Sequence, residues 1–294
     1  MKRARLIYNP TAGRELVEKK LPLLLKRLEK AGYETSCYAT GKPWSAAEEA
    51  KLAAERGFDI VIAAGGDGTI HEVVNGLAGH PNPPKLGILP GGTTNDLARA
   101  LKLPRDLCEA CDVVASGKTM MVDVGKFGGR YFINVAAAGR ITEVTYEAPS
   151  RLKTVIGPLA YYAKAIEKLG TISKPFPIKL KTSQGEWEAE ILLFIIANSV
   201  SVGGFGRLAP SANMSDGMLD VLIVPKTNIS DLLQLAALAF KGEHVRDSRI
   251  VYFQTESLEI DTPEPLKLNL DGEWGGELNG RVETLPNHLE IFCP

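Results

Sequence analysis

The sequence predicts two domains, an α/β domain with a parallel sheet and, after it, a β-rich, antiparallel, sandwich-like domain. Up to about residue 124, short apolar runs lead into glycine-containing turns and then into amphipathic segments, which is typical of strands and helices alternating around a parallel sheet. Beyond that point, short runs of Val, Ile, Phe and Tyr follow one another between turns, as antiparallel strands do. A chain of 294 residues that is 45% hydrophobic is long enough to build two cores.

Three strand–turn–helix units can be placed in the first half. We expect their strands over residues 4–9, 59–64 and 86–89, and the helices that follow over residues 16–31, 70–77 and 97–101. Because parallel strands end at the same edge of their sheet, the turns between strand and helix are expected to meet there.

The second half contains two segments with helical periodicity among its strands. Apolar side chains recur at spacings of three and four residues over 156–169 and 230–240, which predicts a helix in each segment. We place the boundary at residue 124, which gives domains of residues 1–124 and 125–294. A return of the extreme C-terminus to the first domain is left open.

The charge balance and the apolar runs exclude several function classes. A net charge of −1 gives no general attraction to nucleic acid, so no nucleic-acid partner is expected. The longest apolar run, residues 232–240, is too short to span a bilayer, and no signal-peptide pattern follows Met1. We therefore expect a cytoplasmic protein without a transmembrane segment. Cys108 and Cys111 are expected to be free thiols on a helix face rather than zinc ligands.

Glycines and small polar residues gather in the three turns after the predicted strands. Residues 65–69 hold three glycines, which let the backbone approach phosphate oxygens, and the next helix points its positive end at the same place. Residues 90–96 repeat the arrangement with two glycines and Thr94, and residues 9–13 offer a third loop. Any one of these turns alone would be an ordinary helix-start turn, but together they indicate a nucleotide site.

Asp67 is a carboxylate inside one of the predicted phosphate-binding loops. It would repel phosphate unless a metal ion lay between them, so it implies Mg²⁺. Asp96 and Asp123 are candidates to share that ion or its waters. Helix capping and turn formation are the alternatives, and Asp96 stands where an N-cap residue is favoured.

Two motifs, Gly65-Gly-Asp-Gly-Thr69 and Pro90-Gly-Gly-Thr-Thr-Asn-Asp96, carry a resemblance to a known family. The chain resembles the diacylglycerol kinase catalytic family, which includes sphingosine and ceramide kinases, and is most similar to the soluble bacterial kinases of Gram-positive type. NAD kinases share a sequence like the first motif, so the likeness depends on later ones. These are Asn9-Pro-Thr-Ala-Gly13, Gly203-Gly-Phe205, Leu208-Ala-Pro210, Asp216-Gly-Met-Leu-Asp220 and Asp271-Gly-Glu273.

The resemblance implies catalytic roles for three carboxylates. Glu273 matches the family's proton acceptor, although a glutamate after Asp-Gly is otherwise an ordinary exposed turn residue. Asp67 and Asp96 would lie near the magnesium of ATP. The residues implied to line the ATP site are Asn9, Pro10, Thr11, Ala12, Gly13, Thr40, Gly65, Gly66, Asp67, Gly68, Thr69, Ile70, His71 and Thr94.

The resemblance also implies a structural Mg²⁺, held by Asp216 and by backbone carbonyls at Asn213 and Met218. A solvated Asp-Gly turn is the plain alternative. Two positions depart from the family's pattern. Ser215 stands where many relatives have a second acidic residue, and His71 stands where the glycine loop usually continues to asparagine.

The reaction implied by the resemblance is ATP-dependent phosphorylation of diacylglycerol to phosphatidic acid in phospholipid metabolism, with ATP and Mg²⁺ as cofactors. The lipid would be met by peripheral contact with the inner face of the membrane. The basic stretch 151–181 is a candidate surface for that contact, and a solvated helix face is the equal alternative. Pairing of two subunits is an expectation from the family alone. The rival hypotheses are an NAD-kinase-like enzyme for a soluble acceptor and a nucleotide-binding regulator without catalysis.

Overall fold

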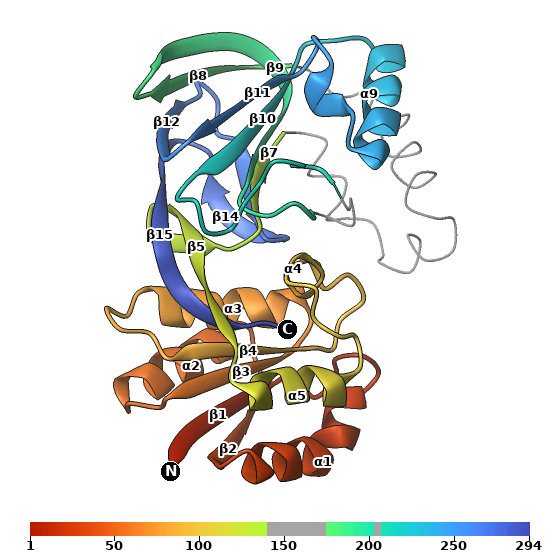
Figure 1. Cartoon of the computed structure of the whole chain (residues 1–294). Coiled ribbons are helices and arrows are strands. Elements are labelled where there is room, and N and C mark those ends of the chain that lie inside the picture. Colours follow the sequence, from red (N-terminus) through yellow and green to blue (C-terminus); the bar gives the residue numbers. More distant parts are fainter. Residues whose placement is uncertain (140–174, 203–206) are drawn as a thin grey trace. The chain divides into compact units, whose positions relative to one another are not determined.

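The structure, a computed structural model, describes residues 1–139, 175–202 and 207–294, which fall into two units (Figure 1). The first unit comprises Met1–Val124, Tyr131–Ile133 and Leu285–Pro294, and the second comprises Gly125–Arg130 and Asn134–Thr284. The helix expected over residues 156–169 and the motif at residues 203–205 lie outside the described residues.

A parallel sheet in the order β2-β1-β3-β4 forms the centre of the first unit. Its strands are β1 (Lys2–Tyr8), β2 (Tyr33–Ala39), β3 (Ile60–Gly65) and β4 (Lys85–Pro90). Every residue of β3 is buried, as in strands that helices cover on both faces. The end of β15 (Gly280–Phe292) adds a parallel pair between Ile291 and Leu86 of β4. The parallel α/β domain predicted from the sequence is confirmed.

Helices cover both faces of this sheet. On one face, alternate residues of β1 and β3, among them Leu6 and Ile62, share a core with α1 and α5. On the other face, the guanidinium of Arg5 contacts the carboxylate of Glu49 on α2 at 2.7 Å. Successive side chains of a strand point to opposite faces of the sheet. Helices α1 and α5 therefore cover one face, and α2 and α3 cover the other (Figure 1). The helices are α1 (Leu16–Lys30), α2 (Ser45–Glu55), α3 (Asp67–Ala78), α4 (Asp96–Ala100) and α5 (Leu107–Ser116).

The sequence pattern does not predict β2 and α2. β2 is an edge strand whose residues are mostly half-buried, so polar and apolar side chains are mixed along it. α2 buries Ala46, Ala50 and Ala53, and alanine contrasts weakly with its polar neighbours in hydropathy. The helical period of this segment is therefore faint in the sequence.

Helices α2 and α3 cross closely because Gly76 has no side chain. A Cβ atom on Gly76 would lie 2.3 Å from the carbonyl oxygen of Ala47 and 2.8 Å from Cβ of Ala50. One turn earlier on α3, the carboxylate of Glu72 accepts a hydrogen bond from the backbone N–H of Ala46 at 3.0 Å. That bond satisfies a donor in the first turn of α2, which has no partner within its own helix.

Antiparallel strands form the second unit, as the sequence predicts, and the sandwich-like fold class is confirmed. The strand order is β14-β13-β7-β9-β8-β12-β15. Along its opposite edge from β7 and β8, β9 pairs with β10, which in turn pairs with β11. β9 is long enough to pair with β8 along its first part and with β7 and β10 further on. The remaining strands are β5 (Thr119–Phe127), β6 (Arg130–Phe132), β7 (Val135–Ala138), β8 (Phe176–Thr182), β9 (Gly185–Ala197), β10 (Leu219–Pro225), β11 (Val251–Thr255), β12 (Ser257–Asp261), β13 (Lys267–Leu270) and β14 (Glu273–Glu277).

Helix α9 (Ile229–Lys241) confirms the helix predicted over residues 230–240. It buries Leu232 and Leu235 in a core shared with Leu222 of β10. Its N-cap residue, Asn228, accepts a hydrogen bond from the N–H of Asp231 at 2.9 Å, which supplies a partner for an unpaired donor of the first turn.

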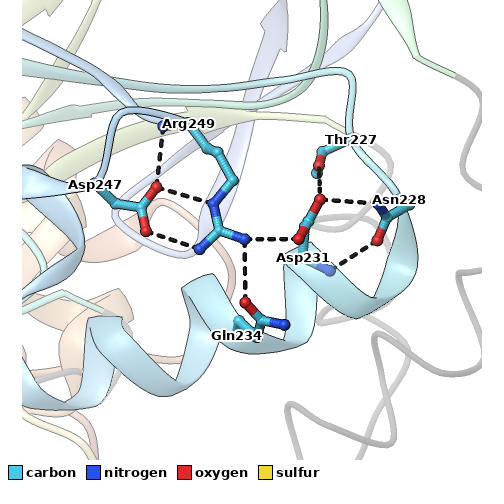
Figure 2. Close-up of polar contacts among 6 residues, drawn as sticks. All are labelled: Thr227, Asn228, Asp231, Gln234, Asp247 and Arg249. Carbon is cyan, nitrogen blue, oxygen red and sulfur yellow. Dashed lines mark hydrogen bonds and ion pairs between the residues drawn. The ribbon is translucent and has the colours of Figure 1, made fainter.

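Arg249 ties α9 to the chain that follows it (Figure 2). Its guanidinium donates to both carboxylate oxygens of Asp247, at 2.9 and 2.7 Å, and to Asp231 of α9 at 2.7 Å. The short 3-10 helix η1 (His244–Arg246) lies between α9 and these residues in sequence. Hydrogen bonds from Arg249 lower the pKa of Asp247 to about 2.

Two observations bear on the expected membrane contact. Among the described residues, no helix is long and apolar enough to cross a bilayer. Lys179 and Lys181 belong to the basic stretch 151–181, and they pair across β8 and β9 with Glu188 at 3.3 Å and Glu186 at 3.6 Å. These two lysines therefore add no uncompensated positive charge. Residues 151–174 of that stretch lie outside the described part of the chain.

We predict that Gly76→Ala destabilises the protein, although alanine is the better helix former by about 1 kcal/mol. The new methyl group would overlap the α2 backbone, and such overpacking costs about 1–3 kcal/mol. Urea unfolding of both proteins measures the difference. Gly41→Ala is the matched control, because nothing lies within 4 Å of a Cβ at that position. Equal stability of Gly76→Ala and wild type would show that the helices do not cross as described.

We predict that Arg249→Met lowers the melting temperature at pH 7, and that the difference from wild type shrinks in acid. The pKa of Asp247 is depressed in the folded state, to about 2 from 3.8. Its stabilising contribution is therefore present above pH 3.8 and is lost as the pH falls towards 2. The pair is still partly open to solvent, so screening keeps the effect small. Thermal unfolding from pH 7 to pH 3 checks it, with Lys179→Met as control, and a difference that stays constant with pH would contradict it.

Candidate functional site

The loops after β1, β3 and β4 meet at one edge of the parallel sheet and are joined by backbone hydrogen bonds. The N–H of Asn9 donates to the carbonyl oxygen of Ala64 at 3.0 Å, and the N–H of Gly91 donates to that of Gly65 at 2.7 Å. Loops separated by tens of residues in sequence are thus fixed to one another through their main chains, as expected from the three glycine-containing turns.

Two glycines show why the backbones can come so close. A Cβ atom on Gly92 would lie 2.6 Å from Cα of Gly66, nearer than such atoms are found. Gly13 has a φ of +58° and faces the carbonyl oxygen of Gly91, to which a Cβ would approach within 2.7 Å. Any side chain at these positions would force the three loops apart. Helix α3 begins at this edge, directly after its N-cap residue Gly66, and the N-terminus of a helix suits an anion.

Asp67, the first residue of α3, links the second loop to the third. One carboxylate oxygen accepts the N–H of Asn95 at 2.9 Å, and the other accepts the N–H of Asp96 at 2.7 Å. The sequence does not predict these partners. Hydrogen bonds to a carboxylate are stronger than those between neutral groups, so Asp67 holds the start of α4 in place.

The N-cap of α4 is Asn95, and the alternative that Asp96 caps this helix is wrong. Asn95 adopts a left-handed conformation with a φ of 51°. Its side chain accepts the N–H of Gly92 at 2.9 Å and donates to the carbonyl oxygen of Gly92 at 2.8 Å. Asn95 therefore shapes the loop that carries Gly92 and Thr94. An asparagine two residues after a Gly-Gly-Thr run is a turn signal that could have identified it.

The first loop is ordered by Asn9, whose side-chain oxygen accepts hydrogen bonds from the N–H of Thr11 at 3.0 Å and from its hydroxyl at 2.9 Å. The N–H of Ala12 donates to the carbonyl oxygen of Asn9 at 3.2 Å. Thr40 lies beside this loop, since its N–H donates to the carbonyl oxygen of Tyr8 at 2.9 Å. These predicted ATP-site residues are therefore neighbours in the first unit.

Some predicted site residues in α3 are buried. Ile70 is 2% exposed and His71 is 1% exposed. The ring of His71 contacts the ring of Trp44 edge-on, with centroids 5.9 Å apart. Their side chains face the protein interior, so a contribution to a nucleotide site would come from their backbone. Thr69 is also buried, whereas Gly68 is half-exposed.

Asp123 lies in β5 and is fully buried. One of its carboxylate oxygens accepts the N–H of Asn287 from β15 at 2.6 Å. This bond joins two strands distant in sequence, a structural role other than the helix capping and turn formation weighed for Asp123.

In the second unit, Glu273 is exposed at the start of β14, directly after a two-residue turn. Asp271 and Gly272 form that turn with φ angles of 52° and 98°, values that an Asp-Gly hairpin tolerates. The side chain of Asp271 accepts the N–H groups of Asn134 and Val135 at 2.8 and 2.9 Å. The sequence motif identifies the turn, but not the segment to which Asp271 fastens it.

The predicted structural metal ligands lie in the loop before β10. Met218 donates its N–H to the carboxylate of Asp216 at 3.0 Å, and Ser215 donates its N–H to the side chain of Asn213 at 3.2 Å. Both are local turn contacts. Among the described residues, no three His, Cys, Asp or Glu side chains converge as a metal site would require. A site here would therefore depend on backbone carbonyls.

Comparison with known proteins agrees with this architecture. Residues 3–127 match the family model described as the diacylglycerol kinase catalytic domain. Residues 135–293 match the model described as the YegS C-terminal NAD kinase beta sandwich-like domain. A crystal structure of a diacylglycerol kinase from Bacillus anthracis aligns with a TM-score of 0.83 and 28% identity, covering 100% of this chain and 97% of that one.

Curated relatives match along nearly their whole length. The diacylglycerol kinase of Bacillus subtilis is 47% identical over 100% of this chain and 97% of its own. The diacylglycerol kinase of Staphylococcus carnosus is 45% identical over 100% of this chain and 95% of its own. The chain therefore belongs to the diacylglycerol kinase family.

Proposed function

We propose that this protein transfers the γ-phosphate of ATP to the free hydroxyl of diacylglycerol and so forms phosphatidic acid. The observation that carries the proposal is the set of three glycine loops held together by backbone contacts and by the carboxylate of Asp67, in a chain of the diacylglycerol kinase family. We assign ATP to residues 1–124 and the lipid to residues 125–294.

The phosphates of ATP lie against the three loops. Phosphoryl transfer depends mainly on positioning and on neutralising charge around the γ-phosphate, and backbone N–H groups at the start of α3 supply both. Hydrogen bonds among the loops fix those groups before the nucleotide arrives. The residues proposed to line the site are Asn9, Pro10, Thr11, Ala12, Gly13, Thr40, Gly65, Gly66, Asp67, Gly68, Thr69, Ile70, His71 and Thr94.

Mg²⁺ fits the donor set of this edge. Asp67 and Asp96 present carboxylate oxygens, and the N–H of Asp96 bonds to the carboxylate of Asp67 at 2.7 Å, so the two residues are neighbours. Hard oxygen ligands of this kind suit Mg²⁺, which takes few protein carboxylates and keeps several waters. When bound, the ion would neutralise charge on the phosphates. A second, structural Mg²⁺ would be held by Asp216 and the backbone carbonyls of Asn213 and Met218.

Glu273 accepts the proton of the lipid hydroxyl as that oxygen attacks the γ-phosphate. An exposed carboxylate at the end of a tight turn can reach an arriving hydroxyl, and general-base help of this kind is worth about 10²–10⁴-fold. Because the acyl chains of diacylglycerol lie in a bilayer, the protein works at the inner face of the membrane by peripheral contact. That two copies pair stays a prediction.

A phosphotransfer assay tests the proposal. Wild type is incubated with ³²P-labelled ATP, Mg²⁺ and mixed micelles that contain diacylglycerol, sphingosine or phosphatidylglycerol, with NAD as a soluble acceptor. We expect labelled phosphatidic acid as the main product, and we expect Glu273→Gln to lower its rate by about 10²–10⁴-fold because the base is lost. Glu277→Gln, at the other end of β14, is the matched control and should keep the wild-type rate.

Each outcome decides a different part of the proposal. Label in NAD alone would refute the lipid acceptor, and label in no acceptor would favour a nucleotide-binding regulator. A wild-type rate in Glu273→Gln would remove the proposed base while leaving the lipid kinase activity in place.

A further inference from the structure

The strand that carries Glu273, β14, has few pairing and packing interactions of its own to fix its position. Among the strands that the structure describes, β14 pairs with β13 alone, so it lies at an edge of the sheet. Its five residues include Gly275 and Gly276, and glycine in a strand has more freedom to lose and no side chain to pack. The β13–β14 register also shifts between Leu268 and Asn269. The sheet alone therefore leaves the position of Glu273 weakly defined.

Asp271, two residues before Glu273, anchors the turn on one side. Its Oδ1 atom accepts the N–H of Asn134 at 2.8 Å and that of Val135 at 2.9 Å. Its own N–H donates to the carbonyl oxygen of Val135 at 2.9 Å. These bonds fasten the turn to the start of β7, next to Asn134, which is 6% exposed. Inside the turn, the side chain of Asn269 accepts the N–H of Gly272 at 2.8 Å.

Arg130 anchors the residue on the other side of Glu273. Its Nη1 atom donates to the carbonyl oxygen of Trp274 at 2.6 Å. The same guanidinium lies over the indole ring of Trp274, 5.1 Å from its centroid. Trp274 is 57% exposed, so this stacking covers a ring that would otherwise face water on one side. A cation over an aromatic face is attracted by the ring as well as by the carbonyl.

We infer that Asp271 and Arg130 are positioning residues that act through Glu273, one on each side of it. The inference rests on the proposed function, in which Glu273 is the general base. A base must come within about 2.6–3.2 Å of the proton that it takes, and an error of about 1 Å in placement can cost 10²-fold in rate. The two charged side chains, from distant parts of the chain, supply the placement that an edge strand with two glycines lacks.

Steady-state kinetics of ³²P transfer to diacylglycerol test this inference in Asp271→Ala and Arg130→Ala. Each variant should lower kcat by about 10- to 100-fold and leave the KM for ATP unchanged, because neither residue belongs to the nucleotide loops. Asp271→Asn should recover most of the loss, since an amide oxygen can accept the same two N–H bonds. Lys226→Ala removes an exposed ion pair of the same unit, to Glu190, and should keep the wild-type kcat.

The Glu273→Gln background separates positioning from a general effect on the fold. If Asp271 and Arg130 act only through the base, then adding either alanine substitution to Glu273→Gln should lower the residual rate no further. Should Asp271→Ala fail to fold, Arg130→Ala provides the same comparison, because Arg130 contacts the exposed residue Trp274.

The possible results are distinguishable. Wild-type kcat in both alanine variants, or a full additional loss in the Glu273→Gln background, would overturn the positioning role and leave the proposed function intact. A wild-type protein that phosphorylates no acceptor would overturn the proposed function, and this inference with it.

Discussion

The carboxylate of Asp67 is the interaction on which the proposed nucleotide site depends. It accepts the N–H groups of Asn95 and Asp96, and so fixes the third glycine loop to the first residue of α3. The glycines allow the loops to touch, since side chains at Gly13 or Gly92 would meet backbone atoms within 2.7 Å. A rigid set of N–H donors at a helix start needs no reorganisation when phosphate arrives, and this preorganisation is what phosphoryl transfer requires.

Aspartate paired to two backbone N–H groups recurs in the structure. Asp271 binds Asn134 and Val135 in the second unit, and Asp106 caps α5 through Cys108 and Glu109. Two charge-assisted hydrogen bonds to one side chain hold a turn more firmly than backbone pairing at a loop can. In this chain, the loops and turns proposed to do the chemistry are thus stabilised by short acidic side chains in addition to the amide side chains of Asn9 and Asn95 and the backbone hydrogen bonds between loops.

Sequence patterns predict the parts of this structure that depend on local order. Strong apolar periodicity places α1, β3 and α9, and the glycine-rich motifs identify the loops that meet at one edge. The same patterns do not reveal β2 and α2, whose hydropathy contrast is weak. Nor do they show that Asp67 binds the N–H of Asn95 or that Asp271 reaches back to Asn134, because these contacts join residues that only the fold brings together. The roles of Glu273 and of the metal ligands stay predictions.

Direct binding of ATP to Gly92→Ala tests most sharply whether the close-packed glycine loops form the nucleotide site. A methyl group here would sit 2.6 Å from Cα of Gly66. If the overpacking cost of about 1–3 kcal/mol falls on the nucleotide-binding arrangement of the loops, the affinity for ATP drops by about 5- to 150-fold. We expect calorimetry with ATP and Mg²⁺ to show that loss in folded Gly92→Ala, while Thr93→Ala, at the exposed neighbouring position, binds as wild type does. Wild-type affinity in folded Gly92→Ala would contradict the account.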